Sequence, residues 1–361
     1  MPATLNFFDT YTLTAIVEQV TPPPSFFKDR YFPTGAGDLF HSKKVLTEFR
    51  DGSRKMAPFV EKRVGDIPVG RRTYEIHEYE PAYIAPSRLL TMDDLEERGF
   101  GEALYANSTP AQRAAALLRD DMADLDARIS AREEWMCAQT MINNGCTMQA
   151  YIDANTQGET YYIGFYDGQT SGHIYTVDSS YKWDSGIGDM RGDIIAMCRM
   201  LSSRGLPATD LVLGTGAAEA LMMEAKFRAM LETTSNIVVG SINEQLTKYD
   251  GVVFMGQLNF GGFRLNVFSV DETVEDDSGN TVHLFPATSA MVTAPGCGHL
   301  MYGQITQIDY GARDPATYVG KRVPKLSVDQ DKDIRKLRLA CCPLAAPKNR
   351  NPFIYAANVC N

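Results

Sequence analysis

The segment TPAQRAAALLRDDMADLDARISAREEWMCAQTMINNG, Thr109 to Gly145, predicts the element around which this chain is built. Thr109 is a suitable N-cap, Pro110 fits the first helical position, and Gln112 completes a capping box. Apolar residues follow at helical spacing, at Leu118, Met122, Leu125, Ile129 and Met136. Gly145 suits the position after the last helical residue. We expect one helix about 50 Å long at ~1.5 Å per residue, which indicates an elongated molecule.

The part of the chain before this helix is unusually charged. Of the 40 residues from 41 to 80, 16 are Lys, Arg, Asp or Glu, against 22% in the whole chain, so the segment cannot form a core of its own. This segment contains two strand patterns, one near each end: Val45 to Phe49 and Arg72 to Tyr79. Tyr74 and Ile76 share one face of the second strand. An isolated two-stranded hairpin is marginal in water. We therefore expect a long hairpin that lies across another chain, with a solvated flap on a monomer as the alternative.

The candidate contacts with a neighbouring subunit lie in this hairpin and just before it. Pro22-Pro23-Pro24 holds the N-terminal segment extended as an arm, and the aromatic residues that follow would bury a large area where the arm docks. Between residues 41 and 80, basic residues outnumber acidic ones by nine to seven, although the chain is acidic overall. The candidate contact residues are Phe26, Phe27, Lys43, Lys44, Arg54, Lys55, Lys62, Arg63, Arg71 and Arg72.

Strand and helix signals alternate after the long helix. Residues 160–165 and 173–177 are expected to pair as a hairpin. Helices are predicted over about 189–204 and 216–231, with a strand at 211–213 between them. Further strands are expected within 252–258, 263–270, 282–285, 334–339 and 353–355. The chain therefore combines an α/β unit with additional strands, and its predicted fold class is α+β.

Composition argues against several functional classes. A chain of 361 residues with 44% hydrophobic residues is long enough for about two packed units. Its 35 basic and 45 acidic side chains leave a net charge of −10, so no basic field favours tight binding of nucleic acid. The seven cysteines lack Cys-x-x-Cys spacing, which argues against a disulfide framework or a zinc site. No secretory or membrane-spanning pattern is found, so a reducing cytoplasm fits best.

Two motifs invite a cofactor-binding or catalytic interpretation. Gly214-Thr215-Gly216 follows a strand and precedes a helix, but Glu219 stands where a dinucleotide-binding loop needs a small residue. Cys297 and His299 are close enough in sequence to form a nucleophile and its base, although no orienting Asn or Asp is identified. We expect no cofactor, no metal site and no catalysis.

In order along the chain, the sequence contains an arm, a charged hairpin, a long helix, an α/β unit and a returning C-terminal strand. Its most characteristic segments are residues 26–32 (FFKDRYF), 57–60 (APFV), 79–84 (YEPAYI), 132–136 (REEWM), 284–286 (LFP), 311–313 (GAR) and 321–344. Through these segments and their order, the chain resembles the tailed-phage major capsid proteins, and more specifically the lambda-type major capsid protein E family, which has the Hong Kong 97 capsid fold. The likeness spans nearly the whole chain and rests on order and spacing.

The resemblance implies a Hong Kong 97-like division of the chain. The expected parts are an N-terminal arm over 1–35, an E-loop over 36–90, a P-domain over 91–186 with its spine helix at about 108–145, an A-domain over 187–320, and a C-terminal return to the P-domain over 321–361. Some relatives join an E-loop lysine to a neighbour's asparagine. This chain has Lys43, Lys44, Lys55, Lys62 and Asn358, but no pair is identified and no crosslink is expected.

The resemblance also implies a structural function without catalysis. Copies would assemble in the host cytoplasm into the hexamers and pentamers of an icosahedral phage head, which encloses double-stranded DNA without sequence-specific binding. A separate scaffolding protein and a portal are expected partners, and a decoration protein is an optional one. The alternatives are an encapsulin-like compartment shell, a cytoplasmic cysteine hydrolase that uses Cys297 and His299, and a tail or decoration component.

Overall fold

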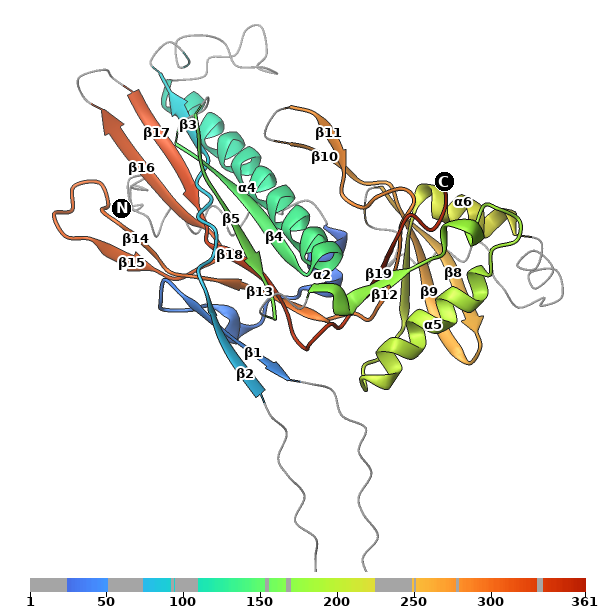
Figure 1. Ribbon diagram of the computed structural model, residues 1–361. Coiled ribbons are helices and arrows are strands. Elements are labelled where there is room, and N and C mark those ends of the chain that lie inside the picture. The colour runs from blue at the N-terminus through green and yellow to red at the C-terminus, as the bar shows by residue number, and fades with distance from the viewer. Residues whose placement is uncertain are drawn as a thin grey trace, which may run out of the picture.

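The computed structural model describes residues 25–50, 74–91, 94, 110–152, 156–166, 170–224, 249, 251–276, 279–329 and 334–361. The molecule is elongated (Figure 1): the long helix α4 (Pro110–Asn143) and the strands around it form one end. A six-stranded sheet with helices α5 (Met190–Ser203) and α6 (Thr215–Met223) forms the other end. The short helix α2 (Phe26–Tyr31) lies where the two ends meet.

Helix α4 confirms the single long helix expected from the sequence, because it runs over Pro110–Asn143 without a break. Its apolar face, which includes Met122, Leu125 and Ile129, packs on a three-stranded antiparallel sheet of order β16-β17-β3. The strands of this sheet are β16 (Val323–Asp329), β17 (Ile334–Ala340) and β3 (Ser87–Leu90). The helix therefore supports one face of the sheet and leaves the other face uncovered by α4.

The C-terminal end of α4 differs from the prediction. Asn144 has a φ of 54°, so an asparagine takes the left-handed position at the helix end, and not Gly145. Gly145 instead begins strand β4 (Gly145–Tyr151) and pairs with Gly164 of β5 (Gln157–Gly164). A Cβ at either glycine would collide with the ring of Tyr162, which covers the pair. Gly145 is therefore needed for this close approach rather than for the turn.

The other end of the molecule is built on a mixed sheet of order β6-β19-β12-β7-β9-β8. Its strands are β6 (Ile174–Thr176), β7 (Asp210–Gly214), β8 (Val252–Phe260), β9 (Phe263–Val270), β12 (Ala290–Thr293) and β19 (Ile354–Ala357). Helix α5 confirms the helix expected at 189–204 and packs on the sheet through residues such as Ile194 and Leu201. Helix α6 ends at Met223, before the predicted 231, and residues 225–248 lie outside the described parts.

Two strands occupy the predicted positions but have different partners. Strand β5 pairs with β4 and not with β6, so the expected hairpin between 160–165 and 173–177 is wrong. Strand β6 instead lies parallel to β19 near the C-terminus. A physical reason is that β4 and β5 are joined by the five residues 152–156, and closing so short a loop costs less conformational entropy.

The end of the chain lies in the six-stranded sheet. Strand β19 lies between β12 and β6 there, and β6 belongs to residues 91–186, the expected P-domain to which the C-terminal segment was expected to return. Three strands before residue 320 lie at the long-helix end (Figure 1). They are β13 (Gly298–Tyr302), β14 (Ile305–Gln307) and β15 (Ala316–Tyr318), and β13 pairs with β18 (Pro343–Pro347). A boundary at residue 320 therefore does not separate the sheets, because hydrogen bonding in β13 and β19 crosses it.

The remaining elements are short. They are β1 (Val45–Arg50), β2 (Tyr74–Tyr79), β10 (Thr273–Glu275), β11 (Thr281–His283) and 3-10 turns at Ala36–Asp38, Thr170–His173 and Ser179–Tyr181. Strands β1 and β2 pair antiparallel, which confirms the base of the expected hairpin. Among the helices that the structure describes, none combines the length and apolarity needed to cross a membrane.

Candidate functional site

The inner face of the β1–β2 hairpin packs on the body of the molecule. Val45, Thr47 and Phe49 alternate along β1 and are all buried. The ring centroid of Phe49 lies 4.7 Å from that of Tyr166 and 6.1 Å from that of Phe165, both edge-to-face. These contacts fix the direction in which the hairpin leaves the body.

The outer face of the same hairpin is exposed and mixes apolar and charged side chains, among them Lys44 beside Glu78. Leu46, Tyr74 and Ile76 are 50%, 54% and 53% exposed. Leu46 lies opposite Glu78, and Glu48 lies opposite Ile76, so acidic and apolar positions alternate across the two strands. We call this surface, Leu46, Glu48, Tyr74, Ile76 and Glu78, the hairpin outer face. Large apolar side chains held this open to solvent mark a surface suited to contact with another protein.

Two predicted contact lysines lie at the base of the hairpin and pair with its own acids. Lys43 is 2.7 Å from Glu80, and Lys44 is 3.4 Å from Glu78. All four side chains are exposed, so each pair contributes little to stability. The other basic candidates, Arg54, Lys55, Lys62, Arg63, Arg71 and Arg72, lie outside the described residues.

Phe26 and Phe27 are fully buried inside their own chain. The Phe26 ring contacts Phe268 of β9 at 5.2 Å between centroids, and Phe27 stacks on Phe285 at 6.2 Å. Their expected contact with a neighbouring subunit is therefore corrected: burial within the single chain leaves neither ring a surface to offer. They hold α2 against the core, in agreement with an aromatic anchor next to the arm.

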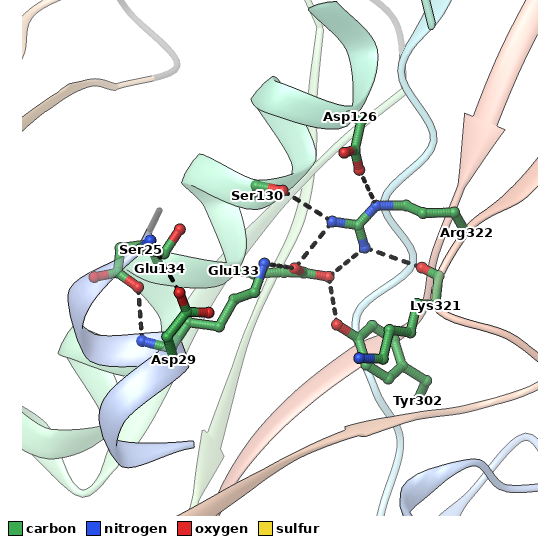
Figure 2. Close-up of polar contacts among 10 residues, drawn as sticks. Ser25, Asp29, Asp126, Ser130, Glu133, Glu134, Tyr302, Lys321 and Arg322 are labelled. Carbon is green, nitrogen blue, oxygen red and sulfur yellow. Dashed lines mark hydrogen bonds and ion pairs between the residues drawn. The ribbon is translucent and has the colours of Figure 1, made fainter. Parts of the chain in front are cut away.

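A buried charge network lies under helix α4 (Figure 2). Arg322 donates to both carboxylate oxygens of Glu133, at 2.6 and 3.0 Å. Its Nε donates to Asp126 at 2.5 Å and its Nη2 to Ser130 at 3.1 Å. Because Asp126 and Glu133 are seven residues apart on α4, one guanidinium bridges two side chains that lie about two helical turns apart. The network joins the residue before β16 to the middle of the long helix.

Glu133 also joins two other segments to α4. The Tyr302 hydroxyl of β13 donates to Oε1 at 2.9 Å, and the Lys28 ammonium of α2 lies 3.0 Å from Oε2. Burial opposes ionisation of Glu133, but the charges of Arg322 and Lys28 outweigh it and hold its pKa below the ordinary value. Burial, with the nearby Glu133 charge, raises the pKa of Tyr302, so this hydroxyl keeps its proton and remains a donor.

Glu134, the next residue on α4, caps helix α2. Its carboxylate accepts the backbone N–H groups of Phe27 at 2.5 Å and Lys28 at 2.7 Å, at a helix start where Ser25 provides no side-chain cap. Burial raises the pKa of Glu134 to about 8, against the lowering effect of the two backbone donors and Lys28, and Glu272 adds to the rise. Glu134 therefore changes charge near neutral pH.

Helix α2 is also bound to the opposite end of the molecule. Arg30 forms a two-pronged pair with Asp210, the first residue of β7, at 2.6 and 3.0 Å. Tyr31 and Asn266 donate to the same buried carboxylate at 3.2 and 3.0 Å. One short helix thus connects the long helix, through Lys28, with the six-stranded sheet, through Arg30.

Cys297 and His299 do not form a nucleophile and base. Burial raises the pKa of the Cys297 thiol to about 12, so the reactive thiolate is scarce at neutral pH. Its Sγ contacts the Tyr31 carbonyl oxygen at 3.9 Å, whereas His299 Nδ1 lies 3.4 Å from Asp38. In the described parts of the chain, no group of three or more His, Cys, Asp and Glu residues is placed to hold a metal ion.

The Gly214-Thr215-Gly216 turn is occupied by the chain itself. A Cβ at Gly214 would collide with the carbonyl oxygens of Pro286 and Ala287. Ala287 also accepts the N–H of Ala217 at 3.1 Å, at the start of α6. Backbone carbonyls therefore fill the position that a phosphate would take in a dinucleotide-binding loop.

The sequence contained a signal for Glu133 that the periodicity argument passed over. Ile129 and Met136 are seven residues apart, and Glu133 fills the helical position between them on the buried face. A buried carboxylate needs a partner of opposite charge, so this gap predicts a buried ion pair. The partner, Arg322, is 189 residues away and has no local signal.

Comparison with known proteins identifies the family. The family model described as "Phage major capsid protein E" matches residues 9–358 of this chain. None of the curated proteins matches this chain.

Solved structures share the fold at low sequence identity. The putative capsid protein of a prophage of E. coli CFT073 has a TM-score of 0.65 and 17% identity, over 96% of this chain and 98% of that one. A phage-related protein from Bordetella bronchiseptica RB50 has a TM-score of 0.50 and 12% identity, over 96% of both chains. These likenesses show that the chain has the fold of phage capsid proteins.

Proposed function

This chain belongs to the phage major capsid protein E family, and we propose that its copies form the hexamers and pentamers of an icosahedral phage head that encloses double-stranded DNA. It is a structural major capsid protein with the Hong Kong 97-like fold, a subunit of a multi-subunit shell, and its location is the virion. Assembly of these shells takes place in the host cytoplasm.

The observation that carries this proposal is the hairpin outer face. Leu46, Tyr74 and Ile76 are about half exposed on a two-stranded ribbon whose other face is already buried in the body. A ribbon of this kind gains stability when a second protein covers it. In a shell, many copies supply such contacts at once, and weak contacts act together.

The partners follow from the same proposal. A separate scaffolding protein and a portal act during assembly, a decoration protein is an optional addition, and DNA is enclosed without sequence-specific binding. The net charge of −10 supports this arrangement, because a strongly basic lining would bind the phosphates of DNA packed against it.

Electron microscopy tests the proposal. The chain is purified from cells that also express the other head genes of its phage, and the particles are imaged in negative stain. We expect uniform closed shells with six-fold and five-fold clusters. Tubes, isolated trimers, or a monomer that stays ordered at high concentration with its hairpin folded on its own body would each overturn the proposal.

A further inference from the structure

The chain passes between the long-helix end and the six-stranded end after β5, after β12 and after β18 (Figure 1). Each of these passages includes a residue with a left-handed backbone: Tyr166 has a φ of 64°, Gly296 of 67° and Asn351 of 48°. Glycine and asparagine adopt this conformation readily, but it is unfavourable for a residue as bulky as tyrosine. Tyr166 therefore depends on contacts that hold it, and such a residue is a candidate for a part that changes conformation.

The hydroxyl group of Tyr166 makes two of these contacts. It donates to the carbonyl oxygen of Asn349 at 2.6 Å and accepts the backbone N–H of Asn351 at 3.3 Å. Both partners belong to the passage between β18 and β19. The Tyr166 side chain is buried, so water does not replace these bonds readily. One tyrosine thus joins the passage after β5 to the passage after β18.

Asn351 is in turn bound from both ends of the molecule. Its Oδ1 accepts from Nδ2 of Asn144, at the C-terminal end of α4, at 3.2 Å. Its carbonyl oxygen accepts from Nη1 of Arg204, the residue after α5, also at 3.2 Å. Arg204 donates as well to the carbonyl oxygen of Gly172 and forms no ion pair within the described residues, so backbone carbonyls fix its position. We call Asn144, Tyr166, Arg204 and Asn351 the junction cluster.

The β1–β2 hairpin contacts the same tyrosine from the other side. The ring of Phe49, on β1, packs edge-to-face on the Tyr166 ring at 4.7 Å between centroids. Glu75, on β2, lies 3.9 Å from Arg350, and the Arg350 guanidinium lies 5.8 Å from the centre of the Tyr166 ring. The hairpin and helix α5 are therefore linked through one buried ring.

We propose that the junction cluster couples the direction of the β1–β2 hairpin to the orientation of the six-stranded end. The backbone of Tyr166 is the element with two states. In one state the hydroxyl bonds hold it left-handed, and in the other these bonds are broken and it relaxes to an ordinary conformation. The ring then shifts away from both Asn351 and Phe49, so the two parts change position together. Coupling of this kind is reciprocal, so a change at Phe49 also loosens the junction cluster.

The coupling has a consequence for assembly. The hairpin outer face is the surface proposed to contact a neighbouring copy, so the orientation of the six-stranded end sets the direction in which that surface points. This consequence rests on the proposed function, whereas the coupling itself is a property of the single chain.

Distances between spin labels on unassembled chains test the coupling. The seven native cysteines are buried, so labels attach to cysteines introduced at exposed positions. These are Glu48→Cys on the hairpin, Ala131→Cys on α4 and Arg191→Cys on α5. The pair at 131 and 191 reports the orientation of the six-stranded end, and the pair at 48 and 131 reports the direction of the hairpin. We expect one narrow distance distribution for each pair in the otherwise unmodified chain.

Tyr166→Phe keeps the ring and removes both hydroxyl bonds. The population of the relaxed state should rise about fivefold, the usual effect of losing a buried hydrogen bond, and both pairs should gain a second, shifted distance. Phe49→Leu changes only the hairpin side of the ring, yet should add the same second distance to the pair at 131 and 191. Tyr355→Phe is the matched control, because it removes a buried hydroxyl that bonds Ser289 within the six-stranded end. It should change neither pair.

Three results would overturn the proposal. In the first, Tyr166→Phe leaves the pair at 131 and 191 unchanged. In the second, Phe49→Leu leaves that pair unchanged, whatever it does to the hairpin. In the third, Tyr355→Phe produces as much of the second distance as Tyr166→Phe, which would mean a general loosening of the chain.

Circular dichroism identifies a variant that does not fold. Asn351→Gly then replaces Tyr166→Phe, because glycine keeps the left-handed backbone while the bond to Asn144 is lost, and Phe49→Met replaces Phe49→Leu. The same second distance is expected from each replacement, and its absence would overturn the coupling. These measurements use unassembled chains, so their outcome does not depend on shell formation. Failure of the coupling is thus distinguishable from failure of the proposed function, which electron microscopy tests.

Discussion

Glu133 is the residue at which helix α4, strand β13, helix α2 and the start of β16 meet. Its carboxylate is buried and bound by Arg322, Lys28 and Tyr302, so removing a charged partner reduces the compensation of a charge in the core. A buried network of charged hydrogen bonds has a directional geometry that apolar packing lacks.

Single substitutions in this network should therefore lower the free energy of unfolding strongly, and their effects should not add. Glu133→Gln and Arg322→Met should each lower the free energy of unfolding by about 3–5 kcal/mol, because each removes a main partner of a buried charge and leaves that charge with a single partner of opposite sign. The double variant should lose less than the sum of the two, with a coupling of about 1–3 kcal/mol. Urea unfolding of unassembled chains measures all three. The exposed change Glu159→Gln is the control, and strictly additive losses would contradict the network.

Glu134 should make the stability of the chain depend on pH. Its pKa is about 8 in the folded chain and near the ordinary glutamate value of 4.5 in the unfolded chain. Between these values the folded state binds more protons than the unfolded state, so stability falls as pH rises from about 4.5 to about 8. The loss is on the order of 5 kcal/mol in total, at ~1.4 kcal/mol per pKa unit.

Glu134→Gln should remove most of this dependence, because an amide does not ionise in this range. Urea midpoints measured between about pH 5 and pH 8 should fall steeply for the unmodified chain and much less for the variant. Glu159→Gln should keep the steep fall. An equal slope in the Glu134 variant would mean that another group titrates.

At the scale of elements, the two faces of the β1–β2 hairpin have different roles, one in the stability of the chain and the other in its proposed assembly. The inner face, through Phe49, contributes to the core of the chain, and the outer face, through Tyr74 and Ile76, is free for contact with a neighbour. The same two strands thus serve two purposes because successive side chains of a strand point to opposite sides.

Substitutions on the two faces should have different effects. Phe49→Ala should lower the free energy of unfolding by about 3–5 kcal/mol, the usual cost of deleting a buried ring. The double variant Tyr74→Ser with Ile76→Ser should change the free energy of unfolding by about 0.5 kcal/mol or less, because both side chains are exposed. It should nevertheless lower the yield of shells. Thermal unfolding and electron microscopy distinguish the two effects. A large loss of stability in the outer-face variant would show that its side chains pack within the chain.

At the scale of the whole molecule, α2 connects the two ends. Lys28 binds Glu133 of the long helix, and Arg30 binds Asp210 of the six-stranded sheet. The residues before α2 form the N-terminal segment expected to act as an arm. Helix α2 therefore joins the long helix to the six-stranded sheet.

Loss of the Arg30 contact should weaken the connection. Arg30→Met leaves the fully buried Asp210 with neutral donors, and we expect a loss of about 3 kcal/mol in unfolding free energy. Hydrogen exchange of the backbone amides should also speed up more in β7 than in α4. Arg191→Met, an exposed arginine on α5, is the control and should change neither quantity. Equal losses from both arginine variants would contradict a specific connection through α2.

Local patterns in the sequence were enough to predict the long helix, helix α5 and the base of the charged hairpin. Each depends on interactions within a few residues: capping, 3.6-residue periodicity, and alternation along a strand. The same is true of Tyr74 and Ile76, whose shared face follows from alternation alone. The diffuse order of these elements was also enough to indicate the capsid family.

Such patterns did not predict which distant strands and which distant charged residues pair with each other. Strand β6 pairs with β19, and Glu133 pairs with Arg322, over separations that no local signal spans. The burial of Phe26 and Phe27 within their own chain, rather than against a neighbour, likewise depends on where α2 docks. These features arise only when distant segments compete for the same core, because the free energy of a long-range contact depends on every other segment already in place.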